Sequence, residues 1–164
     1  MTLRLPAVLI VALAAVATTA AAQAPPPSDP KLVQTVPVWT HKVKLPPPDG
    51  RTFVSDGGLV LDVEVAKPAV RPSESMPADM GTAVAGYLSG YYPTEFGLSD
   101  LRDGPSPAVI VGPQGFAVSR NYVTFLTRYA PRVRLRLKGD GHPVLLVLDQ
   151  RNIGLLLPTV LMSR

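Results

Sequence analysis

The chain has 164 residues, no cysteine and a formal net charge of +4 at pH 7. Without cysteine it can form neither a disulfide framework nor a thiolate zinc site, and it has no cysteine nucleophile. The charge is too small to indicate a polyanion partner by itself, and the length suits one domain rather than two.

The first residues predict an export signal. Arg4 supplies a positive start, an apolar run extends from Leu5 to about Val16, and small residues end the segment at Ala22-Gln23-Ala24. A membrane anchor is the alternative, but the apolar run is shorter than the roughly 18 to 20 residues that a spanning helix needs. We therefore expect a signal peptide at residues 1–24, cut after Ala24, and a periplasmic or secreted protein without a transmembrane span.

Residues 25–37 are rich in proline and predict an extended, poorly ordered leader. A single α+β domain is expected at residues 38–164. It begins with an alternation of apolar and polar residues from Val38 to Leu45, which is typical of a half-buried strand.

Arg51 to Ala66 predicts a short strand, a turn at Asp56-Gly57-Gly58 and a longer strand. In the longer strand the odd-numbered residues from Leu59 to Val65 would face the core. Asp62 and Glu64 would then point to the other side.

Two segments show helical spacing. The first is expected to start at an Asp79 cap and to run through Tyr91, although each of its three glycines costs about 1 kcal/mol relative to alanine in a helix interior. It therefore needs tertiary packing or the close approach of a neighbour. The second helix is expected to begin after Ser119 and to end before Pro131, with Tyr122, Phe125, Leu126 and Tyr129 on one face.

The last third predicts strands. Ala108 to Val111 is a brief apolar strand, followed by a turn at residues 113–115. Arg132 to Lys138 alternates charged and apolar residues, a turn follows, and Val144 to Leu148 is apolar throughout, which indicates a hairpin whose second strand is central. Ile153 to Leu157 could add a strand. The predicted fold class is α+β, a mainly antiparallel sheet with two short helices.

Charge is unevenly distributed along the chain. Residues 49–103 contain nine acidic and four basic residues, whereas residues 104–139 contain six basic residues and no acidic one. Four of these six form a basic row on one face of the predicted strand, at intervals of roughly 7 Å: Arg132, Arg134, Arg136 and Lys138.

The basic row is the first candidate site, for an anionic envelope component or an envelope protein. Nucleic acid is not expected as a partner outside the cytoplasm. The alternatives are a solvated face that discourages edge pairing, and a row neutralised within the protein by Asp62 and Glu64 on a neighbouring strand.

Aromatic residues beside flexible glycines form the second candidate. Tyr87 and Tyr91 fit the apolar face of the first helix and are expected in the core. This leaves Tyr92 and Phe96 as the freer pair, available for stacking on a sugar ring or a partner.

Few residues could support catalysis, because the chain has two histidines. His142, in the hairpin turn beside Asp140, is the one acid-base pair that can be nominated, whereas His41 lies on an apolar strand face. Known catalytic, phosphate-binding, zinc and calcium motifs are missing from the sequence, so no cofactor or metal is expected.

These patterns favour a non-enzymatic binding or interaction module of the bacterial envelope. Arginine outnumbers lysine eleven to five, which suits a bacterium with a GC-rich genome. A small envelope hydrolase or transferase using His142 and Asp140 is the alternative of a different class. A third is an assembly or inhibitor subunit that binds its partner by sheet-edge addition.

Overall fold

A computed structural model describes residues 37–68, 72–139 and 141–159, all within one compact unit, Val33–Arg164. The fold is α+β, with mainly antiparallel strands and two helices of more than two turns, which confirms the predicted fold class. The expected signal peptide, and the leader up to residue 36, lie outside the described residues.

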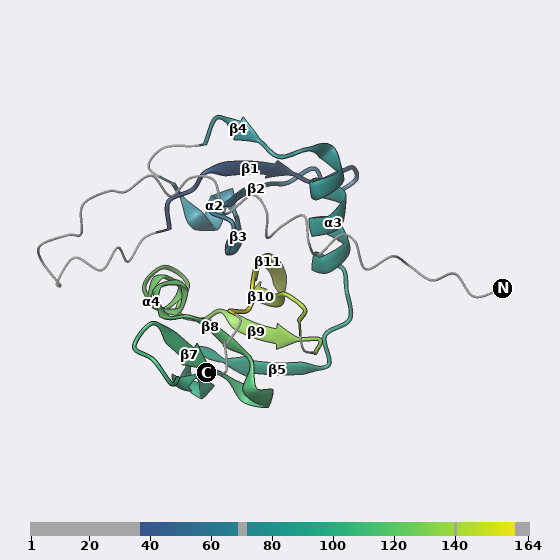
Figure 1. The fold of residues 1–164 in the computed structure, drawn as a ribbon. Coiled ribbons are helices and arrows are strands. Elements are labelled where there is room, and N and C mark those ends of the chain that lie inside the picture. The colour runs from purple at the N-terminus through teal and green to yellow at the C-terminus, as the bar shows by residue number, and fades with distance from the viewer. Residues whose placement is uncertain (1–36, 69–71, 140, 160–164) are drawn as a thin grey trace, which may run out of the picture. The chain divides into compact units, whose positions relative to one another are not determined.

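An eight-stranded sheet forms the larger part of the fold (Figure 1). Across the sheet the order is β4 (Glu74–Ser75), β1 (His41–Lys44), β2 (Thr52–Ser55), β3 (Leu59–Asp62), β11 (Arg151–Leu156), β10 (Val144–Leu148), β9 (Arg134–Leu137) and β5 (Thr94–Gly97). Every neighbouring pair is antiparallel except β1 and β4. The predicted β9–β10 hairpin, the central position of β10 and the additional strand β11 are therefore confirmed.

The fold also contains a three-stranded sheet, in which the strands follow one another in the order β6, β7 and β8. Its strands are β6 (Arg102–Asp103), β7 (Val109–Val111) and β8 (Ala117–Ser119). The short 3₁₀ turn η2 (Leu98–Asp100) precedes β6, and a second one, η3 (Pro113–Gly115), connects β7 to β8. The brief apolar strand and the turn predicted for this region are both present.

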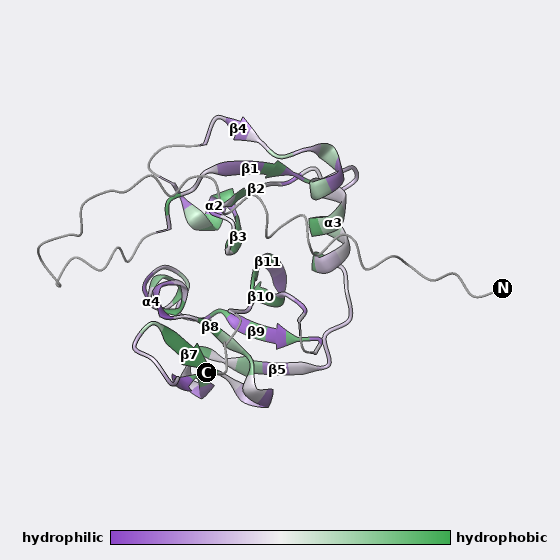
Figure 2. Ribbon diagram, viewed as in Figure 1, coloured by the Kyte–Doolittle hydropathy of each residue, from purple (hydrophilic) through white to green (hydrophobic). Residues whose placement is uncertain are grey.

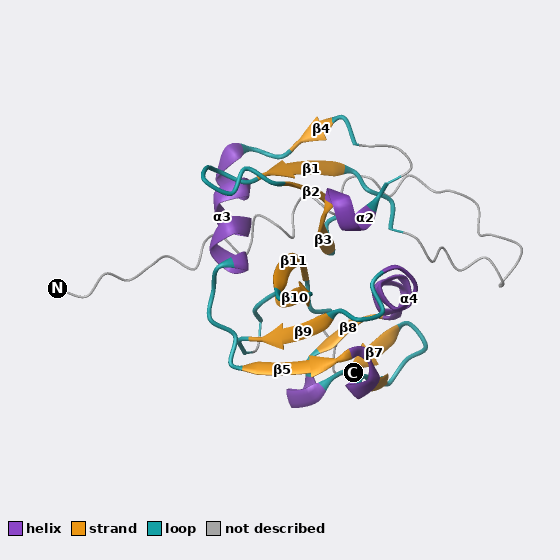
Figure 3. Cartoon of the chain, turned by 180° about the vertical axis from the view of Figure 1, so that it is seen from behind, coloured by secondary structure: helices purple, strands orange, loops and turns teal. Residues whose placement is uncertain are grey.

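The two longer helices pack against opposite faces of the eight-stranded sheet (Figures 1 and 3). Successive residues of β10 alternate between two cores, as the period of a strand requires. Leu145 lies in the core under α3 (Ala78–Leu88), and Leu146 lies in the core under α4 (Arg120–Tyr129). Because both faces are covered, β10 is apolar along its length.

α3 depends on close contact with the sheet, as its glycines predicted. A Cβ atom on Gly81 would collide with the carbonyl oxygen of Lys44 in β1. The expected Asp79 cap is wrong, because Pro77 precedes the helix and Asp79 lies in its first turn. The helix also ends at Leu88 rather than Tyr91, and the Leu88 carbonyl accepts a 2.6 Å hydrogen bond from the Asn152 side chain.

The strand predicted to continue to Val65 ends at Asp62. The chain there turns into the one-turn helix α2 (Val63–Ala66), because the Asp62 carboxylate accepts the Glu64 backbone N–H at 3.0 Å and caps the turn. The prediction that Asp62 points to an exposed face is also wrong, since only 2% of its surface is accessible.

Candidate functional site

The cationic strip consists of Glu95 on β5, Arg134 and Arg136 on β9, and Lys138 just after β9. Glu95 faces Arg136 across the β5–β9 ladder. Its carboxylate accepts hydrogen bonds from Arg134 Nε at 3.3 Å and from Arg136 Nε at 2.5 Å. The two arginine side chains remain 50% and 39% exposed, so solvent and ligands can reach them.

Charge balance within the cationic strip is positive. The hydrogen bond from Arg136, followed by that from Arg134, lowers the pKa of Glu95 below its ordinary value, so the carboxylate is ionised at neutral pH. One carboxylate therefore faces two guanidinium groups, and exposed Lys138 adds a further positive charge. The alternation of hydrophilic and hydrophobic residues along β9 is visible in Figure 2.

The structure divides the predicted basic row. Arg132 precedes β9 and pairs instead with Asp149 at 3.2 Å, with both side chains largely exposed. The alternative in which Asp62 and Glu64 neutralise the row from a neighbouring strand is wrong, because β9 lies between β10 and β5 and is not adjacent to β3. β9 is also not an edge strand, so the alternative in which the row prevents edge pairing between molecules does not apply.

The exposure predicted for the aromatic cluster is reversed. Tyr92 and Phe96 are buried, whereas Tyr91 is 80% exposed and Tyr87 is partly exposed. The reason is that α3 ends at Leu88, and the chain then keeps every fourth residue, Leu88, Tyr92 and Phe96, on the inside. That spacing was visible in the sequence. Tyr92 is further fixed by donating its hydroxyl to the Tyr87 carbonyl at 2.9 Å.

The cationic strip and α3 lie on the same face of the large sheet. Arg136 is opposite Leu145 in the β9–β10 register, and Arg134 is opposite Val147. Leu145 and Val147 both belong to the core that α3 and Tyr92 cover. The strip is therefore the part of this face that continues beyond the helix, toward the β5 edge.

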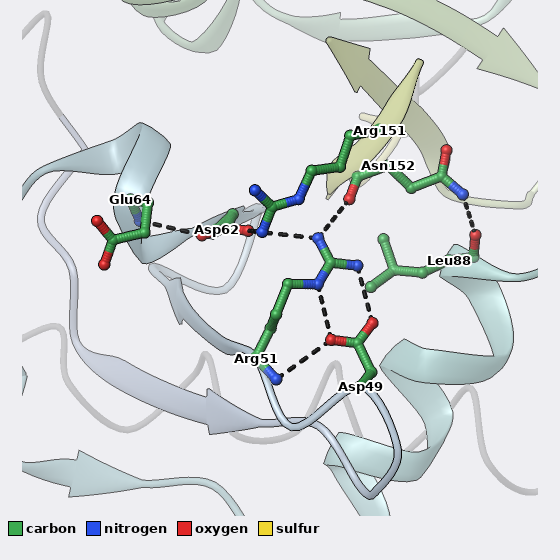
Figure 4. A network of polar contacts seen from close by, with 7 residues as sticks. All are labelled: Asp49, Arg51, Asp62, Glu64, Leu88, Arg151 and Asn152. Atoms are coloured by element: carbon green, nitrogen blue, oxygen red, sulfur yellow. Dashed lines mark hydrogen bonds and ion pairs between the residues drawn. The ribbon is translucent and has the colours of Figure 1, made fainter. Parts of the chain in front are cut away.

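A second cluster of arginines and carboxylates lies where β3 ends and β11 begins, next to the start of β2 (Figure 4). Asp62 Oδ2 accepts from Arg51 Nη1 at 3.3 Å and from Arg151 Nη2 at 2.8 Å. Arg51 also donates to both carboxylate oxygens of Asp49 and, at 2.9 Å, to the Asn152 carbonyl. Sequence reasoning missed this network, because Asp62 and Arg151 are neighbours only through the pairing of β3 with β11.

The Asp62 network has a structural character. Among the described residues, every buried side-chain nitrogen and oxygen atom has a hydrogen-bond partner. A carboxylate that accepts from two guanidinium groups and a backbone N–H has little capacity left for a ligand. The network therefore links β2, β3 and β11 and does not present a reactive group.

The nominated acid-base pair is only partly described. His142 is half-buried in the β9–β10 turn, and Asp140 lies outside the described residues, so the pair remains a prediction. His41 hydrogen-bonds to the Thr40 hydroxyl at 2.8 Å and lies 3.5 Å from Glu74. Within the described ranges, no group of three or more His, Asp or Glu residues is placed to hold a metal ion.

The surface of the described residues includes two hollows. The first, about 360 Å³, is lined by Pro37, Val38, Thr40, Asp56, Ser119, Asn121 and Tyr122. Burial, followed by the nearby Asp56 carboxylate, raises the pKa of Tyr122 well above its usual value, so its hydroxyl stays protonated and cannot serve as a base. The second hollow, about 690 Å³, lies over the small sheet and is lined by Asp100, Arg102 and Asp103 among others. Neither one contains the predicted site residues.

In the eight-stranded sheet, sheet-edge addition would require exposed backbone at β4 or β5. β4 is two residues long, which offers little backbone for pairing. On β5, the Gly97 N–H points away from β9 and donates to Asp100 at 2.6 Å. Because backbone groups alternate along a strand, Glu95 is the remaining interior residue of β5 with its groups directed outward. Both edges are therefore poor templates for a partner strand.

Comparisons with protein-family models, curated proteins and solved structures find no match to this chain. Among the described residues, none of the helices combines the length and the apolar character that crossing a bilayer requires.

Proposed function

We propose that this protein is an exported, non-enzymatic binding module of the bacterial envelope and that its cationic strip contacts an anionic ligand. One observation supports this most directly: a single carboxylate, Glu95, holds two guanidinium groups side by side while both remain substantially exposed. The binding groups are thus positioned before a ligand arrives, and less side-chain entropy is lost when it binds.

The chemistry of arginine fits this role. A guanidinium group has five N–H donors in a planar fork, and Glu95 occupies one Nε donor of each arginine, which leaves terminal donors for a second anion. Carboxylate, phosphate and sulfate groups match this fork. Since β9 is an interior strand of the sheet, the arginine backbones are held by neighbours on both sides.

The test compares two double variants of equal charge. Arg134→Gln with Arg136→Gln removes the strip arginines, and Arg102→Gln with Arg128→Gln removes two exposed arginines from β6 and α4. On a sulfonate matrix eluted with a salt gradient, the strip variant should elute at clearly lower salt than the control. Salt screens exposed charges within a Debye length of about 8 to 10 Å at moderate ionic strength, so the difference should shrink at high salt.

Circular dichroism and melting temperature provide the folding control, because the strip ion pairs are exposed and contribute little to stability. If both double variants elute together, retention reflects net charge alone and the proposed contact surface is wrong.

A further inference from the structure

Residues 86–95, from the last turn of α3 into β5, connect the exposed tyrosines to the cationic strip. The exposed residues of this segment are Gly86, Tyr87, Ser89, Tyr91, Pro93 and Glu95, while Leu88, Tyr92 and Phe96 point inward. Thr94 pairs with Leu137, the residue between Arg136 and Lys138. Tyr91 therefore lies within about 10 Å along the backbone of the strip's Lys138 end, given roughly 3.3 Å per extended residue.

Small neighbours surround the two exposed tyrosines. A Cβ atom added to Gly86 would meet nothing within 4 Å, so the space beside Tyr87 is open. Ser89 turns its hydroxyl back to the Ala85 carbonyl at 2.9 Å rather than outward. No charged residue occurs between Asp79 and Glu95. Tyr91 thus presents most of its ring to solvent and Tyr87 presents part of it, each with a hydroxyl at the ring edge.

We infer that the ligand of the cationic strip is an acidic polysaccharide, whose sugar rings stack on Tyr87 and Tyr91 while its acid groups pair with Arg134, Arg136 and Lys138. This inference rests on the proposed function and specifies the ligand class. Two exposed aromatic side chains and guanidinium groups held by Glu95 match a chain that carries both ring faces and repeated negative charges.

Anionic lipid is a weaker match to this surface. Helices that lie on membranes combine an apolar face with lysine or arginine on the polar face. α3 has no basic residue, and its one charged residue is Asp79 in the first turn. The tyrosines therefore lack the cationic helix surface that would hold them at a bilayer.

An acidic protein is also a weaker match. The buried centre of a protein interface is more apolar than the rest of the surface and is depleted in lysine and glutamate, two residue types that the cationic strip contains. The exposed large hydrophobic residues of the described chain are Val38, Tyr87, Tyr91 and Tyr129, so no large aliphatic side chain is exposed along the segment from Gly86 to Glu95.

The experiment measures affinity of the protein for polygalacturonate, which carries a carboxylate on each sugar, by isothermal titration calorimetry at low salt. Three other probes separate ring stacking from charge: the methyl-esterified polymer, polyglutamate, and phosphatidylglycerol vesicles. The Tyr87→Ala/Tyr91→Ala variant should bind polygalacturonate about tenfold more weakly, as expected for losing two stacking contacts. Tyr129→Ala, which removes an exposed tyrosine from α4, is the matched control and should bind as the unchanged protein does.

The unchanged protein should prefer polygalacturonate to the esterified polymer, which lacks the carboxylate charges. It should also prefer polygalacturonate to polyglutamate and to the vesicles when these are compared at equal charge. Equal affinity for polyglutamate or for vesicles would overturn the inference. Unchanged binding by the tyrosine variant would also overturn the inference. In that case, weak binding by Arg134→Gln/Arg136→Gln would still support the cationic strip as the binding surface. If neither double variant lost affinity, the proposed function would fall as well.

Discussion

The protein uses the same ionic unit twice, a carboxylate shared by two arginines, in two different surroundings. The Asp62 carboxylate is almost completely buried although its partners Arg51 and Arg151 reach solvent, whereas the Glu95 carboxylate is as accessible to solvent as Arg134 and Arg136 are. Burial removes the water that would otherwise solvate the carboxylate, so the first unit must be fully paired. The second unit is screened by water and contributes little to stability. The comparison shows that burial of the carboxylate, rather than residue type, separates a structural unit from one that is open to solvent.

The largest effect should come from the buried unit. Asp62→Asn removes the charge that both arginines share and weakens the cap of α2, and we expect it to lower the free energy of unfolding by about 3 kcal/mol. Urea denaturation measures this. The control is Asp49→Asn, which removes a more exposed carboxylate from the same arginine and should cost less than about 1 kcal/mol. Similar losses of unfolding free energy in both variants would show that burial does not increase the contribution of Asp62 to stability.

The two ends of α3 provide a second contrast between buried and exposed positions. Gly81→Ala should destabilise the protein by about 2 kcal/mol, because the added methyl group collides with the backbone of β1. Gly86→Ala should be neutral or stabilising by up to about 1 kcal/mol, since the site is open and alanine favours the helix. Thermal unfolding distinguishes the two. Equal shifts in melting temperature would contradict the packing of α3 on β1.

The smallest effect on stability should come from the exposed unit. Glu95→Gln should change the free energy of unfolding by less than about 1 kcal/mol, yet the variant should elute from a sulfonate matrix at higher salt at pH 7 because the strip gains net positive charge. The pKa of Glu95 is lowered, so its contribution to stability is present above the ordinary value of 4.5 and is lost as pH falls through the folded value. Elution of the two proteins should therefore converge as pH falls below that range. If the difference in elution between the two proteins stayed the same as pH fell, Glu95 would not be titrating within the strip.

Local patterns predicted much of the fold. The alternation in β9, the apolar run in β10 and the helical spacing of α4 are determined by period and burial, and all three appear as expected. Errors arose where side-chain hydrogen bonds compete with the pattern. The Val63–Ala66 segment has the alternation of a strand, but the Asp62 cap turns it into a helix.

The candidate site was predicted less completely, because it depends on contacts between distant parts of the chain. The sequence identified Arg134 and Arg136, which share β9, and Lys138, which directly follows that strand. It could not identify Glu95 as their partner, since β5 joins β9 only in the folded sheet. Tyr91 was assigned to the core because the helix was extended too far, and the end of α3 depends on Asn152 in β11.

The position of β11 has a consequence for the rate of folding. β11 is the last strand of the described residues, yet it pairs with β3 on one side and β10 on the other and so joins the two halves of the eight-stranded sheet. Contacts between residues so far apart in sequence close large loops, which slows folding. We expect the sheet to remain open until β11 has been synthesised. A nascent chain that lacks residues 151–156 would leave both β3 and β10 with an unpaired edge, and this makes it a candidate for aggregation or for binding by a chaperone.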